Sequence, residues 1–244
     1  MLQRTTRLLV SFVMIMAGAV IGVGAASGTA QAASCYTWNR TLSQGSSGAD
    51  VTQLQIRVAG WVTSGERLSY DGQYGARTAA AVKKFQAAYG LSADGVAGPK
   101  TFSKIYALQD ADCTPIHFTY AELNRCNSTW SGGAVSAATA KSNALKTMWK
   151  LEAMRHQLGD VPIQISSGFR SYACNKAVGG SATSRHLYGD AADLVGSPSF
   201  CRLAQQARTH GFSQILGPGY PDHSDHTHVA FSPSQLWSAS RCGI

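Results

Sequence analysis

The chain has 244 residues, of which 44% are hydrophobic and only 14% are charged. This composition excludes intrinsic disorder, because the charged share lies well below the ~25% of an ordinary soluble domain. The formal net charge is +8, and the length allows one large domain or two smaller ones of about 100–200 residues each.

The first 33 residues are typical of an export signal that is later removed. They contain no acidic residue, and Arg4 and Arg7 precede an uncharged stretch over 8–23. That stretch is slightly short for a membrane span of about 20 residues, and the Ala-Gln-Ala at 30–32 is a small-x-small cleavage site, which favours a cleaved signal over a membrane anchor. We therefore expect a secreted protein with no membrane attachment.

Removal of this signal changes the charge of the exported protein. Without Arg4 and Arg7, 19 of the 21 basic residues remain against 13 acidic ones, which leaves +6. These charges form no basic run, so nucleic acid is not an expected partner, whereas a modest positive charge suits a polyanionic target such as the bacterial wall.

All six cysteines lie beyond the signal. An even number in an exported chain predicts three disulfides, although six cysteines allow 15 pairings. No two of them form a Cys-x-x-Cys pair, so neither a thiolate zinc site nor a redox motif is expected. The six are Cys35, Cys113, Cys126, Cys174, Cys201 and Cys242.

Two segments, at 71–78 and 94–101, share the pattern Asp-Gly-x-x-Gly-x-x-Thr. The glycines predict a turn, because glycine tolerates positive φ. We expect Thr78 and Thr101 to cap the helices that follow. Apolar residues recur at helical spacing after each threonine, and also over 51–58. Three short helices around one small core are therefore expected.

The two turns lie in a frame that resembles the peptidoglycan-binding module attached to many bacterial wall hydrolases, over about residues 40–108. This resemblance implies that a shallow groove on the three-helix unit docks cell-wall glycan or stem peptide. The matching positions are Leu42, Gly45, Val51, Leu54, Gln55, Asp71, Gly72, Tyr74, Gly75, Thr78, Val82, Phe85, Gln86, Gly90, Leu91, Asp94 and Gly95.

A larger domain is expected after the Cys-Thr-Pro junction at 113–115. Apolar spacing predicts a long helix over 136–158, and alternation predicts a strand over 161–165. Ser197-Pro198 is expected to open a second helix, which Gly211 ends. Helices interleaved with short strands predict an α+β domain, with a mainly antiparallel sheet.

Four of the seven histidines fall in two clusters of this second domain. Imidazole and carboxylate groups suit zinc, and a catalytic zinc site takes three protein ligands and leaves a fourth position for water. His186, Asp193 and His228 would supply two nitrogens and one oxygen, if a turn through Gly189 folds the first two together. The four histidines are His186, His223, His226 and His228.

The second cluster, at 222–228, reads Asp-His-Ser-Asp-His-Thr-His. In a strand, His226 and His228 would point to the same face, so one can bind metal while the other stands beside the bound water. Asp225 would point to the opposite face, so its catalytic use requires the strand to begin after it or to bulge there. Alone, this cluster fits a surface loop equally well, but the two clusters together favour a functional site.

The combined pattern resembles the zinc D-alanyl-D-alanine carboxypeptidase family over about residues 115–244. It consists of Ser-x-His-x-x-Gly-x-Ala-x-Asp at 184–193, Asp-His-x-His at 225–228, and Ser-Gly-Phe-Arg-Ser at 167–171. This family shares its metal site with the vancomycin-resistance dipeptidases and the hedgehog signalling domain. The order of the two modules is similar to that of its secreted actinobacterial members.

The resemblance implies a role for each site residue. The zinc ligands would be His186, Asp193 and His228. Arg170 would hold the terminal carboxylate of the substrate, and Asp225, His226 and His223 would manage protons. Related dipeptidases carry a glutamate where this chain has Asp225, which leaves open whether Asp225 or His226 is the general base. The resemblance also implies the sequential disulfides Cys35–Cys113, Cys126–Cys174 and Cys201–Cys242.

Three functions remain as hypotheses. The first is a secreted zinc carboxypeptidase that removes the terminal D-alanine from peptidoglycan stem peptides. The second is a zinc endopeptidase that cuts cross-bridges and lyses walls, and it differs in needing no free carboxylate after the scissile bond. The third is a wall-binding protein with a silent zinc site, against which the unligated Asp225 and His226 argue.

The expected organisation is a signal peptide over 1–33, a peptidoglycan-binding module over 34–112 and a zinc peptidase domain over 113–244. We expect one zinc ion, peptidoglycan as the partner, an extracellular or cell-wall location and a monomer.

Overall fold

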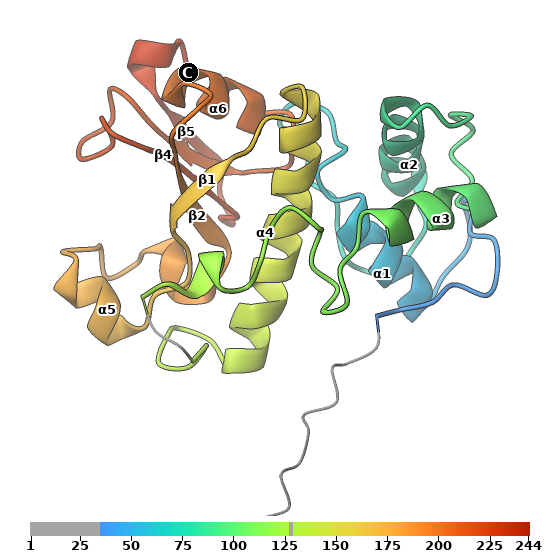
Figure 1. Ribbon diagram of the computed structural model, residues 1–244, viewed down its shortest axis with the longest axis horizontal. Helices are drawn as coiled ribbons and strands as arrows, with labels where there is room; N and C mark the ends of the chain where they lie inside the picture. The colour runs from blue at the N-terminus through green and yellow to red at the C-terminus, as the bar shows by residue number, and fades with distance from the viewer. Residues whose placement is uncertain (1–34, 127–128) are drawn as a thin grey trace, which may run out of the picture. The chain divides into compact units, whose positions relative to one another are not determined.

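The computed structural model describes residues 35–126 and 129–244, so the expected signal peptide lies outside the described residues (Figure 1). Within the described ranges, no helix is long and apolar enough to cross a membrane. The first part of the chain forms three helices, α1 (Ala49–Arg57), α2 (Ala76–Ala88) and α3 (Pro99–Ala107), as the repeat predicts.

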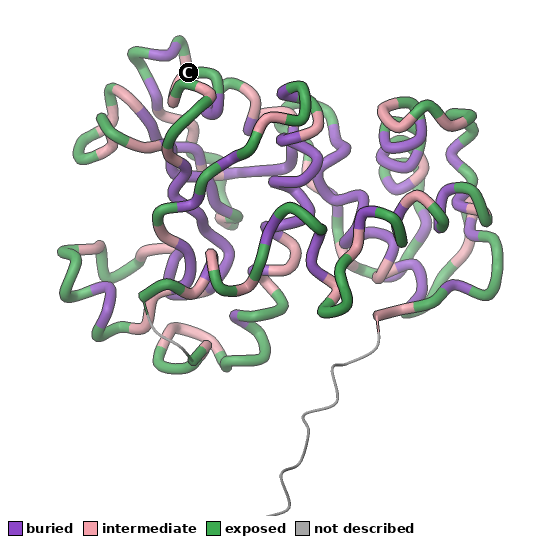
Figure 2. Tube along the Cα trace, viewed as in Figure 1, coloured by how far each residue is buried: buried purple, intermediate pink, exposed green. Residues whose placement is uncertain are grey.

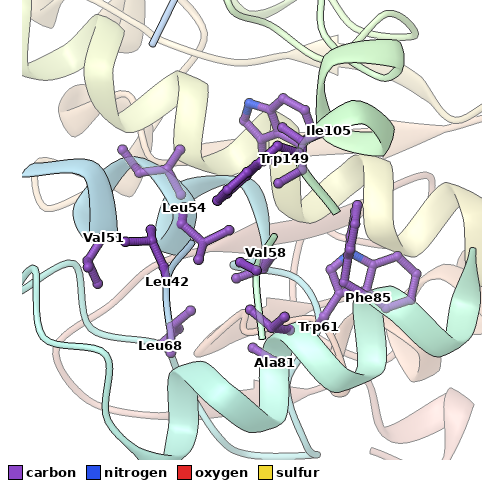
Figure 3. Packing of buried hydrophobic residues seen from close by; sticks show 14 of the residues in the cluster. Leu42, Val51, Leu54, Val58, Trp61, Leu68, Ala81, Phe85, Ile105 and Trp149 are labelled. Atoms are coloured by element: carbon purple, nitrogen blue, oxygen red, sulfur yellow. The ribbon is translucent and has the colours of Figure 1, made fainter. Parts of the chain in front are cut away.

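The three helices enclose a hydrophobic core, to which Trp149 of the second part of the chain also contributes (Figure 3). Val51 and Leu54 of α1 are fully buried, as is Leu42 before them. Phe85 of α2 packs edge-on against Trp61, with ring centroids 6.1 Å apart. The apolar positions of the repeat therefore form the core that their spacing predicts.

The expectation that Thr78 and Thr101 cap helices is wrong. The residues at the N-cap positions are Gly75 and Gly98, neither of which offers a side-chain hydrogen bond. Both threonines lie inside the first helical turn and are buried.

Each threonine instead belongs to a polar cluster around one buried glutamine of the preceding helix. Gln55 Nε2 donates to Asp71 Oδ1 at 2.9 Å and to Thr78 Oγ1 at 3.2 Å. Gln55 Oε1 accepts from the Gly72 amide at 3.0 Å. The same contacts recur one repeat later around Gln86, with Asp94, Gly95 and Thr101.

The second part of the chain forms a five-stranded sheet in the order β1-β2-β4-β3-β5. All neighbouring pairs are antiparallel except β3 and β5, which run parallel. The predicted α+β class and the mainly antiparallel sheet are therefore confirmed. The strands are β1 (Gln164–Ser167), β2 (Ala191–Val195), β3 (Gln214–Leu216), β4 (Thr227–Ala230) and β5 (Leu236–Ser238).

Two helices cover one face of this sheet. The predicted long helix is α4 (Ala137–Gln157), and its apolar residues pack with those of α6 (Phe200–Ala207) and of the strands in one core. Figure 2 shows buried residues along α4 and through the strands. Asp193 and His228, which are paired across β2 and β4, alternate with the core residues of those strands and so lie on the other face.

Two predicted boundaries shift. The first strand begins at Gln164 and not near Val161, because its pairing with β2 starts at Gln164 and Val195. The second helix begins at Phe200, where the Ser199 hydroxyl accepts from the Arg202 amide and caps it. The remaining elements are α5 (Tyr172–Ala177) and the short 3-10 helices η1 (Glu122–Asn124), η2 (Arg185–Tyr188) and η3 (Ser240–Cys242).

The two parts of the chain meet along α4. Trp149 and Ala153 of α4 belong to the core of the three-helix unit. A Cβ on Gly60 would lie only 2.5 Å from the Ala153 Cβ, so this close approach requires glycine. Nearby, the His210 ring donates from Nδ1 to the Gly60 carbonyl at 2.7 Å.

The three expected disulfides are confirmed, and the described residues contain no free cysteine. The first bridge closes the three-helix unit, and the other two lie in the sheet-bearing part. They are Cys35–Cys113, Cys126–Cys174 and Cys201–Cys242.

Candidate metal centre

A tight turn places His186 beside Asp193. His186 lies in η2, which ends at Gly189 in the left-handed conformation, with φ 74°. A Cβ on Gly189 would collide with the carbonyl of Ala140, so both the backbone angle and the space require glycine. The chain then enters β2, and His186 Nε2 lies 3.1 Å from Asp193 Oδ1. This is the fold-back that the spacing of the motif required.

His228 completes a group of three buried side chains. It faces Asp193 across β2 and β4, and its Nδ1 lies 2.9 Å from Asp193 Oδ1 and 3.1 Å from His186 Nε2. Within the described residues, this is the one group of three or more histidine, cysteine or acidic side chains placed to hold a metal ion.

The outer nitrogen of each imidazole is held by an oxygen that accepts a hydrogen bond. His186 Nδ1 lies 2.5 Å from the Gly168 carbonyl, and His228 Nε2 lies 3.2 Å from Gln214 Oε1. Each outer nitrogen must therefore carry the proton of a neutral ring. Both inner nitrogens then direct lone pairs toward an oxygen of Asp193, and a convergence of three lone pairs calls for a cation.

The chemistry and spacing of these atoms fit zinc. Ligand atoms held at about 2.0–2.2 Å in a tetrahedron lie about 3.3–3.6 Å apart. The three atoms here are 2.9–3.1 Å apart, so an expansion of a few tenths of an ångström would admit the ion. Two imidazoles and one carboxylate are also a usual zinc ligand set, with a fourth position left open.

The surroundings set the charge of the centre. Burial alone would raise the pKa of Asp193, but the adjacent imidazoles of His186 and His228 lower it well below its usual value. Burial lowers the pKa of His228, which favours its neutral form. An ionised carboxylate and a neutral imidazole are the forms that bind a metal.

Asp225 and His226 lie immediately outside the strand. Because β4 begins at Thr227, the condition for the use of Asp225 is met without a bulge. The His226 ring donates from Nδ1 to Asp225 Oδ1 at 2.8 Å, and its Nε2 lies 3.8 Å from Asp193 Oδ1. The hydrogen bond to His226 lowers the pKa of the Asp225 carboxyl, whose side chain is 86% exposed. Nε2 of His226 therefore faces the candidate metal centre, and Asp225 fixes the ring through a hydrogen bond to Nδ1 on its other side.

His223 lies next to this pair. Its ring centroid is 4.6 Å from that of His226 and 5.9 Å from that of His228. Its Nδ1 donates to the Pro221 carbonyl at 2.6 Å, and burial lowers its pKa. The structure thus brings all three histidines of the second cluster to one side of Asp193.

Arg170 lies beside the centre but is already engaged. Its Nη2 lies 2.7 Å from Asp193 Oδ2, and its Nε donates to Ser167 Oγ at 2.8 Å. The family resemblance assigns Arg170 to the substrate and does not indicate this contact with a candidate ligand. The sequence does not indicate Gln214 either, because a residue on a separate strand carries no motif that points to the metal centre.

Two family models match the chain. Residues 116–230 match peptidase M15, and residues 47–105 match a peptidoglycan binding domain. The chain is 64% identical over 229 residues to a zinc D-Ala-D-Ala carboxypeptidase of Streptomyces albus G. The match covers 93% of this chain and 88% of that protein.

Two solved structures match shorter segments, each at 37% identity. One is a peptidoglycan-binding protein from Clostridioides difficile, with 27% of this chain and 39% of that chain covered and a TM-score of 0.24. The other is a Burkholderia AP3 phage endolysin, with 44% and 36% covered and a TM-score of 0.25.

Proposed function

We propose that this chain, which belongs to the peptidase M15 family and its zinc D-Ala-D-Ala carboxypeptidases, hydrolyses the terminal D-alanyl-D-alanine bond of peptidoglycan stem peptides and releases D-alanine. The observation that carries this proposal is the convergence of two imidazole nitrogens and one carboxylate oxygen within hydrogen-bonding distance of one another. The 64% identity to a carboxypeptidase over most of both chains supports the choice of reaction.

His186, Asp193 and His228 would hold the zinc ion. The hydrogen bonds of the two outer nitrogens leave His186 Nε2 and His228 Nδ1, with Asp193 Oδ1, as the atoms that would bind it. When bound, zinc supplies a Lewis acid that lowers the pKa of water and polarises the scissile carbonyl.

His226 moves the proton. Its Nε2 faces the centre, so it can take a proton from the attacking water and deliver it to the amine of the leaving D-alanine. Asp225 accepts from the opposite nitrogen, Nδ1, which fixes the ring with Nε2 toward Asp193. His223 lies next to His226, with ring centroids 4.6 Å apart, and we assign it a supporting role in this proton transfer. This division of labour makes His226 the general base and Asp225 its orienting partner.

Arg170 selects a substrate with a free C-terminus. Two of its three guanidinium nitrogens are held by Asp193 and Ser167. The third, Nη1, has no hydrogen bond to any residue that the structure describes, so it can donate to the terminal carboxylate of the substrate. A fixed, permanently charged donor in this position favours a carboxypeptidase over an enzyme that cuts within cross-bridges.

The three-helix unit docks the enzyme on its polymeric substrate. Its match to a peptidoglycan binding domain over residues 47–105 supports this role. The proposed organisation is a signal over 1–33, a binding module over 34–112 and a peptidase domain over 113–244, in a secreted monomer that acts on the wall.

One experiment tests this function against its alternatives. Purified protein lacking the signal is incubated with a D-Ala-D-Ala stem peptide and with cross-linked wall, each with and without a zinc chelator. We expect D-alanine release that the chelator abolishes. New amino groups in the wall, without D-alanine release from the peptide, would indicate an endopeptidase. Binding to the wall with neither product would indicate a silent zinc site.

A further inference from the structure

The two histidines of the candidate metal centre each make a hydrogen bond through the outer ring nitrogen, but the acceptors are of different kinds. The outer nitrogen of His186 donates to a backbone carbonyl, that of Gly168. The outer nitrogen of His228 donates to the side chain of Gln214, across 3.2 Å. A substitution can remove a side chain but not a carbonyl, so the orientation of His228 depends on one replaceable residue.

We propose that Gln214 is a positioning residue that fixes the ring and the tautomer of His228 for zinc, an inference that rests on the zinc site proposed above. The sheet holds Gln214 in place for this role. It lies on β3, which pairs with β4 on one side and β5 on the other. Leu216 lies opposite His228 and Gln214 lies opposite Ala230, so Gln214 is the diagonal neighbour of His228 on the same face.

The tautomer of His228 decides whether it can bind a metal. A neutral imidazole carries one proton, and the nitrogen that carries it cannot be a ligand. With the proton on Nε2, the lone pair of Nδ1 points at Asp193 Oδ1, 2.9 Å away. The Gln214 carbonyl oxygen favours this form because it accepts the Nε2 proton. Without that acceptor, the ring is free to adopt the other tautomer, which directs an N–H at the zinc position.

The Gln214 side chain has no competing role in the described parts of the chain. Its hydrogen bond to His228 is the one that it makes there, and the residue is only half-buried. Loss of its amide should therefore disturb the metal site more than it disturbs the fold. This separates positioning from a general structural role.

The test compares zinc affinity across variants, with chelator competition as the readout. We expect Gln214→Leu to bind zinc about 10–100-fold more weakly than the unaltered protein, which is the usual effect of removing a group that orients a ligand. Gln214→Glu keeps an acceptor at the same reach, so we expect affinity equal to or tighter than that of the unaltered protein. Gln164→Leu, on the edge strand β1 and away from the ligands, is the matched control with unchanged affinity.

Two further measurements separate positioning from folding. The zinc-free Gln214→Leu protein should unfold at the same temperature as the zinc-free unaltered protein, whereas a merely structural role would lower that temperature. In nuclear magnetic resonance spectra of the zinc-loaded protein, the His228 Nε2 proton should exchange faster with solvent in Gln214→Leu. If the leucine variant does not fold, Gln214→Asn shortens the side chain, withdraws the acceptor and serves in its place.

Asp193→Ala distinguishes failure of this proposal from failure of the zinc site. Wild-type zinc affinity in Asp193→Ala would overturn the site and the role of Gln214 together. Loss of zinc in Asp193→Ala with unchanged affinity in Gln214→Leu would overturn the role of Gln214 alone. An equal loss in Gln214→Leu and Gln214→Glu would also overturn it, because the acceptor would then not matter.

Discussion

Asp193 and Asp225 carry the same functional group in opposite surroundings. Asp193 is buried between two imidazoles and Arg170, while Asp225 is exposed and touches the centre only through His226. A buried carboxylate among cationic and polar partners suits a metal ligand, because burial limits competition from water. An exposed carboxylate behind a histidine suits a positioning role. The two residues are therefore not interchangeable.

Replacement of His226 should separate proton transfer from metal binding. We expect His226→Gln to lower kcat by about 10²–10⁴-fold, the usual contribution of a general acid–base group. Zinc content should not change, because His226 is not a proposed ligand. Asp225→Asn should cost less, since His226 remains. The assignment is contradicted if Asp225→Asn loses more kcat than His226→Gln, which would make the aspartate the base.

The two turns of the three-helix unit are held by equivalent glutamines. Gln55 and Gln86 are each buried, and each uses both ends of its amide on the turn that follows its helix. Buried amide groups of this kind stabilise a fold only while every partner is satisfied. The repeat in the sequence is thus a repeat of hydrogen bonding as well as of hydrophobic spacing.

Loss of one such glutamine should destabilise the unit. We expect Gln86→Leu to lower the free energy of unfolding by about 1–3 kcal/mol, because the Gly95 amide and the Thr101 hydroxyl lose a buried partner. Gln73→Leu is the control, since Gln73 is exposed and should change stability little. Chemical denaturation of both variants measures the difference. Equal stabilities would show that the buried amide is not needed.

The sequence predicts the helices, the turns and the three side chains that converge at the candidate metal centre, but not the partners that come from distant elements. Spacing locates the turns, and the motif containing Gly189 locates His186 and Asp193. The true role of Thr101 depends on Gln86 of another helix, and the hydrogen bond of His228 depends on Gln214 of another strand. No local pattern encodes such pairs, because they form only when the chain has folded.

The long helix α4 contributes side chains to both hydrophobic cores. Met148 and Leu151 pack on the sheet, whereas Trp149 and Ala153 pack on the three-helix unit. The sequence predicts only the first of these stripes. In the second stripe the apolar pattern is interrupted by Lys150, a charged residue that is buried and donates from Nζ to the Gly211 carbonyl at 3.0 Å.

His210 should make this contact sensitive to acid. Burial lowers its pKa to about 4, and its Nδ1 donates to the Gly60 carbonyl. The pKa of a histidine in the unfolded chain is about 6.5. Between pH 6.5 and pH 4, His210 is therefore protonated in the unfolded chain but neutral in the folded protein. The contribution of His210 to stability is therefore nearly constant above about pH 6.5 and falls as the pH drops toward 4, by about 2 kcal/mol between pH 7 and pH 5.

The matched variant for this effect is His210→Gln, which cannot titrate. Unfolding free energies at pH 7 and pH 5 measure the change in both proteins, and the variant should lose about 2 kcal/mol less than the unaltered protein. Equal losses in the two proteins would show that His210 does not couple the contact to pH.

In the proposed function, removal of D-alanine depends on one zinc ion bound by His186, Asp193 and His228. The most direct test titrates zinc into metal-free protein while zinc content and D-alanine release are measured on the same sample. We expect activity to rise in proportion to bound zinc and to saturate at one ion per chain, and we expect Asp193→Ala neither to bind the ion nor to release D-alanine. Full activity without bound zinc, or in Asp193→Ala, would contradict it.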